Sequence, residues 1–163
     1  MTVRCTRRGQ VPIGVLNVIG RVFMPPADCP FRAASAAVES LRERAAIILV
    51  DMHGEATSEK VAMGRHLDGR VSAVIGSHTH VQTADEGILA GGTAYLTDAG
   101  MCGPEDSVLG VRTDRVLARF LTQLPTRFDV ASGPSIVQGA FIDVDPTAGR
   151  ATGIRRIRER VSG

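Results

Sequence analysis

The sequence predicts an α/β domain with a layered, mixed sheet, and two observations lead to this class. Short apolar segments at residues 47–51 and 71–75 each follow a stretch with the spacing of an amphipathic helix. Near the C-terminus, alternating segments at residues 136–145 and 151–160 are separated by Gly- and Pro-containing turns. The first pattern is typical of parallel strands joined by helices, and the second of closing antiparallel strands.

The individual elements follow from local composition. Residues 11–19 are rich in β-branched side chains and predict a strand, whereas three prolines make residues 21–30 a loop. Alanine and leucine at helical spacing predict a helix over residues 31–44. Residues 47–51 begin with four consecutive apolar residues, which is typical of a strand buried on both faces.

A second helix is expected to begin at Thr57 or Ser58, which we assign as its cap, and to end near Leu67. Later elements are expected, in chain order, as strands at residues 71–75 and 93–97, a helix at residues 113–124, and closing antiparallel strands around residues 127–131, 136–145 and 151–160. No repeat or interdomain linker is visible, so residues 1–163 are interpreted as a single domain.

Composition excludes several classes of protein. The 163 residues are 44% hydrophobic, which suits one globular core, and no stretch reaches the roughly 18 apolar residues of a membrane span. The N-terminal segment lacks the apolar core of a secretory signal, so a cytoplasmic location is expected. Three widely spaced cysteines, Cys5, Cys29 and Cys102, predict neither a disulfide framework nor a zinc finger.

The charge pattern does not predict a nucleic-acid polymer as partner. The formal net charge is only +2, and aromatic residues make up 4% of the chain, so a base-stacking platform is not expected. The arginine-rich C-terminal segment, residues 153–161, alternates with Ile154, Ile157 and Val161. This alternation favours a solvated last strand or short helix over an RNA-binding strip.

Three of the four histidines follow predicted strands. His53 comes after residues 47–51, and His78 and His80 come after residues 71–75. Ligand sites in α/β sheets gather beyond the carboxyl ends of the strands, and imidazole is a common ligand of transition metals. These three residues are therefore candidate metal ligands, although a solitary loop histidine is more often only hydrogen-bonded.

Neighbouring residues suggest supporting roles. Glu55, two residues after His53, is a candidate partner that orients a ligating imidazole. His66 is assigned to the end of the second helix rather than to the site. The loop at residues 98–104 either borders a pocket or forms a plain turn, and its Cys102 is interpreted as an inert thiol. Arg21 is interpreted as a surface residue, with a phosphate contact as the alternative.

The segments that carry these histidines resemble a known family. His53 lies in Asp51-Met-His-Gly-Glu55 and the other two lie in Gly76-Ser-His-Thr-His80. Matching strings cover residues 17–26, 51–60, 68–85 and 92–104, with a looser match from residue 124 to residue 145. On these strings the sequence resembles the YmdB-type metallophosphoesterases of the calcineurin-like superfamily, which are associated with 2′,3′-cyclic-nucleotide phosphodiesterase activity.

The resemblance implies a fold and a chemistry. The family fold is an αββα sandwich with two iron or manganese ions at the strand ends. His53 and His78 would then be ligands of one ion, and His80 a ligand of the other. A metal-bound hydroxide would attack phosphorus while both ions stabilise the phosphoryl oxygens.

The chain departs from that family in its N-terminal part. The family's Gly-Asp, Asn-Gly-Glu-Asn and Gly-Asn-His motifs are absent, and the only asparagine, Asn17, lies in a matched strand. The chain thus resembles the C-terminal half of the family domain, and the proton-donor histidine, a catalytic residue, has no counterpart. Three neutral imidazoles cannot hold two cations about 3.5–4 Å apart without a bridging carboxylate, so we expect at most one bound ion.

Three functional hypotheses follow. The first is a metal-dependent phosphodiesterase or phosphatase whose isolated chain is weakly active or inactive. Its missing half is expected upstream in the same reading frame, on another polypeptide, or supplied by a homo-oligomer. The second is a non-catalytic remnant that acts as a binding domain. The third is a mononuclear zinc hydrolase with His53, His78 and His80 as its ligands. The absence of half of a layered fold should bare a sheet edge and an apolar face. The second hypothesis instead predicts a soluble, monodisperse chain without phosphodiesterase activity.

Overall fold

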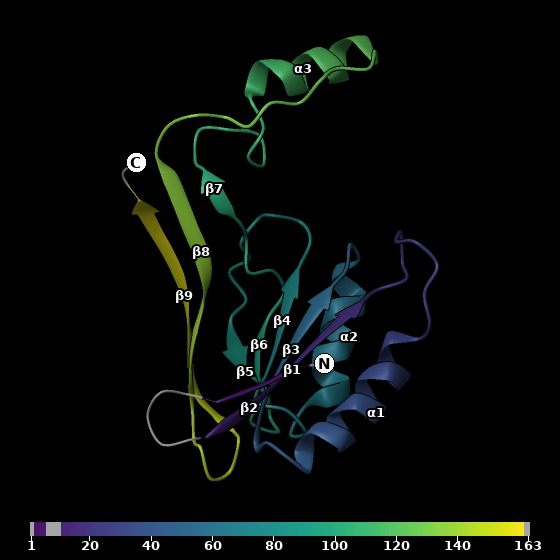
Figure 1. Ribbon diagram of the computed structural model, residues 1–163, viewed down its shortest axis with the longest axis vertical. Helices are drawn as coiled ribbons and strands as arrows, with labels where there is room; N and C mark the ends of the chain where they lie inside the picture. The colour runs from purple at the N-terminus through teal and green to yellow at the C-terminus, as the bar shows by residue number, and fades with distance from the viewer. Residues whose placement is uncertain (1, 6–10, 162–163) are drawn as a thin grey trace.

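The computed structural model describes residues 2–5 and 11–161 of the chain, the first four by backbone only (Figure 1). The basic residues 7 and 8 at the N-terminus and the side chain of Cys5 lie outside the described part. Cys29 and Cys102 are free thiols. No helix among the described residues has the length and apolar character needed to span a membrane.

The first sheet has six strands in the order β1-β2-β3-β4-β6-β5. β2, β3, β4 and β6 run parallel, and β1 and β5 pair antiparallel at the two edges. The strands are β1 (Thr2–Cys5), β2 (Pro12–Ile19), β3 (Ile47–His53), β4 (Ala73–Ser77), β5 (Gly87–Ile88) and β6 (Ala94–Leu96). Parallel strands need long crossovers, and α1 (Pro30–Arg42) and α2 (Thr57–Leu67) supply the first two.

The second sheet is antiparallel, with the order β7-β8-β9. Its strands are β7 (Cys102–Pro104), β8 (Ser135–Val144) and β9 (Ala151–Val161), and α3 (Thr113–Thr122) lies between β7 and β8. β7 pairs only with residues 135–137 of β8, whereas β9 pairs along the whole of β8. Both long C-terminal strands and their antiparallel pairing confirm the sequence prediction.

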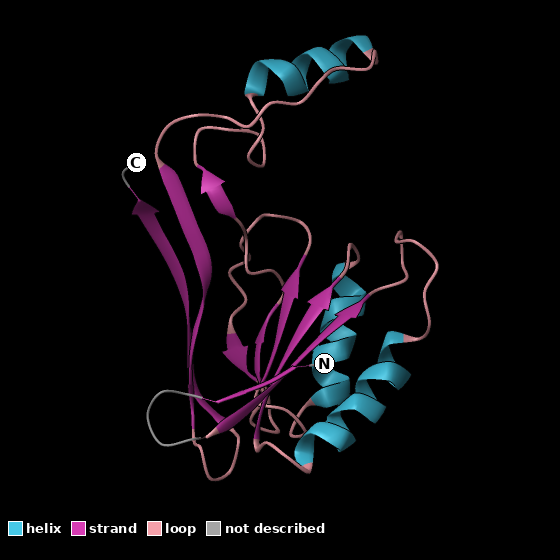
Figure 2. Cartoon of the chain, viewed as in Figure 1, coloured by secondary structure: helices cyan, strands magenta, loops and turns pink. Residues whose placement is uncertain are grey.

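The elements form three layers, with helices, first sheet and second sheet in that order (Figure 2). α1 and α2 pack on one face of the first sheet and bury Leu41, Ile48, Met52 and Met63 completely. β8 and β9 cover part of the opposite face, where Ala73, Ala94 and Ala151 form a smaller core. No described helix covers the outer face of the second sheet, so the outer α layer of an αββα sandwich is absent from the described part.

Three local predictions were wrong. The cap of α2 is Ala56 rather than Thr57 or Ser58, and no side chain caps this helix. β3 is buried on one face only, because alternate residues are buried and half-buried. Residues 127–131 form no strand; Val130 makes one isolated bridge to Val111, because this segment folds back along α3 instead of joining a sheet.

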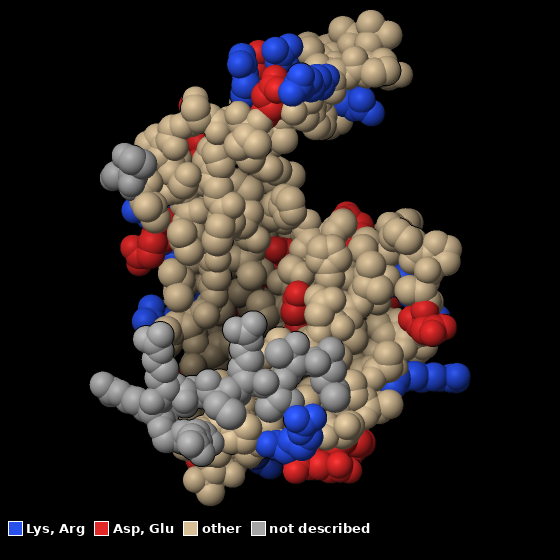
Figure 3. All heavy atoms as spheres, viewed as in Figure 1, with Lys and Arg blue, Asp and Glu red and all other residues tan. Residues whose placement is uncertain are grey.

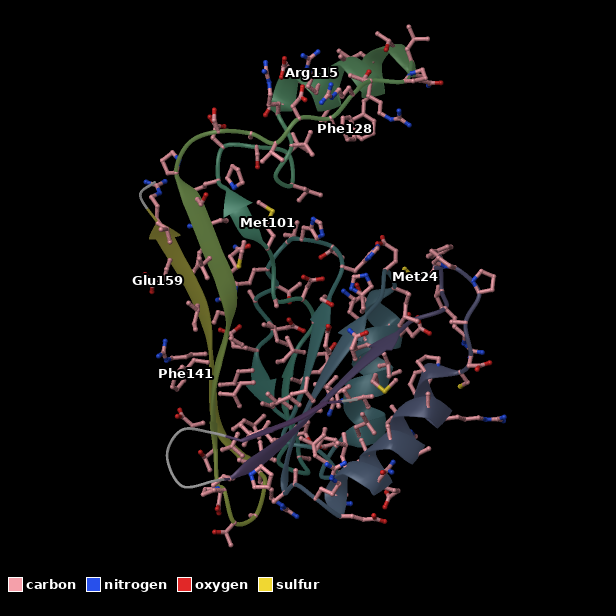
Figure 4. All side chains as sticks on the ribbon, in the orientation of Figure 1. Met24, Met101, Arg115, Phe128, Phe141 and Glu159 are labelled. Carbon is pink, nitrogen blue, oxygen red and sulfur yellow. The ribbon has the colours of Figure 1, made fainter. Side chains whose placement is uncertain are left out.

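The segment from β7 to β8 forms an arm that projects from the body of the molecule (Figures 1 and 4). Within the arm, the backbone amide of Arg112, just before α3, donates a hydrogen bond of 3.0 Å to the carbonyl oxygen of Asp129, in the segment that returns from α3. Within α3 only Val116 is buried, whereas Phe120 and Leu121 are 74% and 82% exposed. The arm therefore presents an uncovered apolar surface.

Candidate functional site

Strand register brings His53 next to His78. β3 and β4 are parallel neighbours in which His53 pairs with Ser77, the last residue of each strand. His78 follows Ser77 directly. The carboxyl ends of parallel strands share one edge of a sheet, which explains why residues 25 positions apart in the sequence meet here.

A chain of hydrogen bonds fixes the ring of His53. The Ser77 hydroxyl donates to Asp51 Oδ1 at 2.6 Å and lies 3.1 Å from His53 Nδ1. Asn17 Nδ2 donates to the other carboxylate oxygen of Asp51 at 2.6 Å. Because the hydroxyl has one proton, and Asp51 receives it, Nδ1 of His53 must donate to Ser77. This assigns the free lone pair of His53 to Nε2.

The ring of His78 is held between His53 and a carboxylate. Its Nδ1 lies 3.1 Å from His53 Nε2, and its Nε2 lies 3.2 Å from Glu55 Oε2. A carboxylate beside Nε2 favours a proton on that nitrogen, which leaves a lone pair on Nδ1. Two lone pairs at this distance repel each other unless a proton or a metal ion lies between them. Glu55 thus contacts one of the candidate ligating imidazoles, that of His78.

His80 lies along the same cavity without joining the imidazole pair. His53, His78 and His80 line a cavity of about 550 Å³ together with Met101 and the base of the arm. Figure 4 labels Met101, which lies between the sheet and the arm. Across residues 2–5 and 11–161, no three His, Cys, Asp or Glu side chains gather closely enough to hold an ion. The three-histidine zinc hypothesis requires such a convergence, and the described residues do not provide it.

The turn that carries these histidines has an unusual backbone. His78 and His80 have φ angles of 115° and 64°, in a region that side chains other than glycine rarely adopt. Each such residue costs on the order of 1–3 kcal/mol. The preceding Gly76 has no room for a side chain, since a Cβ there would overlap the carbonyl oxygen of Thr97.

A buried ion pair lies directly beneath this turn. Lys60 and Asp98 are both 0% exposed, and Nζ lies 2.9 Å from Oδ2. Burial raises the pKa of Asp98, but hydrogen bonds from Lys60 and from the amides of Gly100 and Thr79 outweigh it, so the pKa lies below its usual value. Neither residue was predicted from the sequence as part of a site. The only signal was that Lys60 is the single lysine of the chain.

The remaining sequence assignments divide as follows. His66 lies outside the site, where its Nε2 is 2.8 Å from Ser35 Oγ and its ring meets Phe31 edge-on. The loop at residues 98–104 borders the cavity, which decides between the two interpretations of that loop. Cys102 is exposed, with Sγ 3.8 Å from the carbonyl oxygen of Gln138.

Comparison with solved structures defines the class as an α/β fold of the phosphoesterase type. A hypothetical protein from Thermus thermophilus superposes with a TM-score of 0.88 at 40% identity, over 97% of this chain and 61% of the other. A structure described as a novel phosphatase from Mycoplasma pneumoniae gives a TM-score of 0.84 at 30% identity, over 99% and 57%.

The chain belongs to the YmdB-like protein family, whose model matches residues 1–157. It is 49% identical over 145 residues to a 2′,3′-cyclic-nucleotide 2′-phosphodiesterase of Bacillus subtilis (strain 168). That match covers 89% of this chain and 55% of the relative. The chain therefore spans about half the length of this curated relative, and the family resemblance expected from the sequence is confirmed.

Proposed function

We propose that this chain carries part of the metal site of a phosphoester hydrolase that acts on phosphodiesters, with 2′,3′-cyclic nucleotides as the substrate class. One observation carries the proposal: Nε2 of His53 and Nδ1 of His78 face each other across 3.1 Å at the wall of an open cavity. The activity for which the Bacillus subtilis relative is named supports the substrate class.

The imidazole pair fits a metal ion. Metal–nitrogen bonds of about 2.0–2.1 Å at tetrahedral or octahedral angles place two ligating nitrogens about 3 Å apart. Nε2 of His53 and Nδ1 of His78 already have this separation. An ion held there, iron or manganese by family resemblance, would supply Lewis-acid activation of water and of the phosphoryl oxygens.

The residues around the pair orient it. Asp51 and Ser77 hold His53 so that its Nε2 faces the ring of His78. Glu55 lies beside Nε2 of His78, so that Nδ1 of this ring faces His53. Such outer partners fix the tautomer and raise the basicity of a ligating imidazole. His80, which lies on the same cavity, is proposed as a ligand of a second ion whose other ligands this chain lacks. We therefore expect about one bound ion for each isolated chain.

We propose that a completing partner binds at the open side of the first sheet. Val15, Leu49 and Ile75 line a mostly apolar cavity of about 390 Å³ that Ile142 of β8 closes on the other side. From residue 138 to residue 144, β8 pairs with β9 alone among the described strands. An unpaired edge beside an apolar face is suited to strand addition.

We propose that the occupant is the segment that the relatives carry outside the matched region. The superposed Thermus thermophilus protein matches 97% of this chain but has a further 39% of its own length outside the match, given the 61% that is covered. That length is ample to cover the open face. The competing occupant is a second copy of this chain, which the test below separates by mass.

The decisive experiment measures metal content and hydrolysis of bis-p-nitrophenyl phosphate. This chain is assayed alone and with a polypeptide that comprises the Bacillus subtilis relative outside the matched 145 residues. We expect about one manganese per isolated chain, and more metal, measurable hydrolysis and a one-to-one complex in the mixture. His53→Ala and His78→Ala should each abolish manganese binding, whereas His66→Ala, the matched control, should not.

Several results contradict the proposal. If the wild-type chain and His53→Ala bind the same amount of manganese, the imidazole pair is not a metal site. If the mixture gains metal and forms a complex without hydrolysis, the chain is a binding domain and the catalytic proposal is wrong. A homodimer that the added polypeptide does not dissociate would identify the occupant as a second copy.

A further inference from the structure

The function proposed above assigns no role to the buried ion pair of Lys60 and Asp98. Lys60 projects from α2, and its Nζ donates to Asp98 Oδ2 at 2.9 Å and to the Ser77 carbonyl at 3.0 Å. Neither residue touches an imidazole in the hydrogen-bond network. Taking two charges out of water costs several kcal/mol for each ion, and apolar residues of similar volume fill such a site without that cost.

The ion pair makes hydrogen bonds to both loops that border the histidine cavity. Asp98 Oδ2 accepts a hydrogen bond of 3.0 Å from the amide of Thr79, between the two histidines of the turn. Its Oδ1 accepts one of 3.0 Å from the amide of Gly100, on the facing loop. With Lys60 holding the Ser77 carbonyl, one pair of side chains fixes residues 77–79 and residues 98–100 relative to each other.

The turn needs such a restraint because it is strained. His78 and His80, which flank Thr79, both have positive φ angles. A backbone in this region relaxes when the surrounding structure no longer determines it. Relaxation at His78 would change the 3.1 Å separation from His53 Nε2, since the imidazole moves with its backbone.

We propose that Lys60 and Asp98 are positioning residues, which hold the strained turn so that His78 faces His53 across a metal-sized gap. The inference rests on the proposed function only where it concerns metal affinity. The geometry of the two rings is a property of the metal-free chain and is measured separately.

The test is the double variant Lys60→Met/Asp98→Asn. It removes both charges together, so no uncompensated charge stays buried, and it preserves side-chain volume closely. The amides of Thr79 and Gly100 face different oxygens of Asp98. Asparagine in the same position presents an NH₂ group to one of them, so one of the two hydrogen bonds is lost. The variant therefore loses the restraint while keeping the packing.

Two readouts distinguish positioning from stability. In ¹⁵N-histidine NMR of the metal-free chain, the ring signals of His53 and His78 should shift, while those of His66 should stay, since His66 lies outside the site. In a Co²⁺ titration the dissociation constant should rise about 10–100-fold, the usual cost of losing an outer partner of a metal ligand. The control is Glu39→Gln/Arg70→Met, which removes an ion pair on the helix side of the molecule and should change neither the His53 and His78 signals nor the dissociation constant. In this control the His66 signal should shift instead, because Arg70 also donates to Ser35, the partner of the His66 ring.

If the double variant does not fold, Lys60→Met alone is used, because Asp98 can then become neutral by taking up a proton. Unchanged His53 and His78 signals, with a Co²⁺ dissociation constant within about twofold of wild type, would overturn the proposal in either variant. If the wild-type chain binds no Co²⁺ but the two ring signals still shift, the positioning role stands and the metal function fails.

Discussion

The two faces of the first sheet differ in how fully the chain covers them. On β2, Leu16 and Val18 point toward the helices and are 6% and 7% exposed, whereas their neighbours Val15 and Ile19 are 36% and 38% exposed. Both sets are apolar, so hydropathy alone does not explain the difference. The helices complete one face, and β8 and β9 cover only part of the other (Figure 1).

The candidate site lies at the carboxyl ends of β3 and β4, with the helices on one side of it and the open face of the sheet on the other. The ion pair beneath the histidine turn belongs to the helix-covered side, because Lys60 comes from α2. The cavity in front of the histidines belongs to the open side and extends toward the arm. Figure 3 shows the wide space between the arm and the body of the molecule. The candidate site is therefore enclosed on its helix-covered side and exposed on the other.

The sharpest comparison replaces one leucine on each face. Leu16→Ala should lower the free energy of unfolding by about 2–5 kcal/mol, because Leu16 is 6% exposed in the main core. Leu49→Ala, on the adjacent strand and the opposite face, should cost about 1–2 kcal/mol, because Leu49 is only partly buried. Urea unfolding followed by circular dichroism measures both. Equal losses would show that the second face is as well packed as the first.

Acid should weaken the helix-covered side through Asp98. Its folded pKa lies below the usual value of 3.8, so the folded state binds fewer protons than the unfolded state in that range. The stabilisation is complete above the unfolded value and is lost as the pH falls through the folded value. The urea midpoint of the wild-type chain should fall more between about pH 6 and about pH 3 than that of Lys60→Met/Asp98→Asn. Equal falls would mean that Asp98 contributes no such stability.

The fold could be predicted because its signals are local. The two long C-terminal strands alternate clearly, and the helical spacing at residues 31–44 is that of α1. The short edge strands β5 and β7 were missed because two or three residues carry no periodicity. The segment at residues 127–131 alternates like a strand, but its only bridge is to the arm's own Val111.

The site could be predicted only in part, for a different reason. His53 and His78 share a strand end, which residue spacing after apolar segments can reveal. The contacts of Asp51 with Ser77, and of Lys60 with Asp98, depend on strand register and helix placement. Both connect residues 26 or more positions apart, and no sequence pattern links them. That Glu55 contacts His78 in particular could not be predicted, because the direction of its side chain is not encoded in the local pattern.

The strain in the histidine turn predicts a smaller effect. His80 has a φ angle of 64°, where glycine is favoured over alanine by about 1 kcal/mol or more. His80→Gly should therefore unfold at a higher urea concentration than His80→Ala, although both remove the imidazole. As a control, the same pair of substitutions at His66, inside α2, should give the reverse order, because alanine is the better helix former.

The smallest effect is expected on the arm, which belongs to the open side. Phe120→Ser/Leu121→Ser should change the free energy of unfolding by less than about 0.5 kcal/mol, because both side chains are mostly exposed. Binding of the dye ANS should fall, since an exposed apolar surface is removed. Val116→Ser, at the one buried position of α3, is the control and should destabilise measurably. If Phe120→Ser/Leu121→Ser destabilises the isolated chain as much as Val116→Ser does, the arm packs against the body, and the open side is smaller than the structure shows.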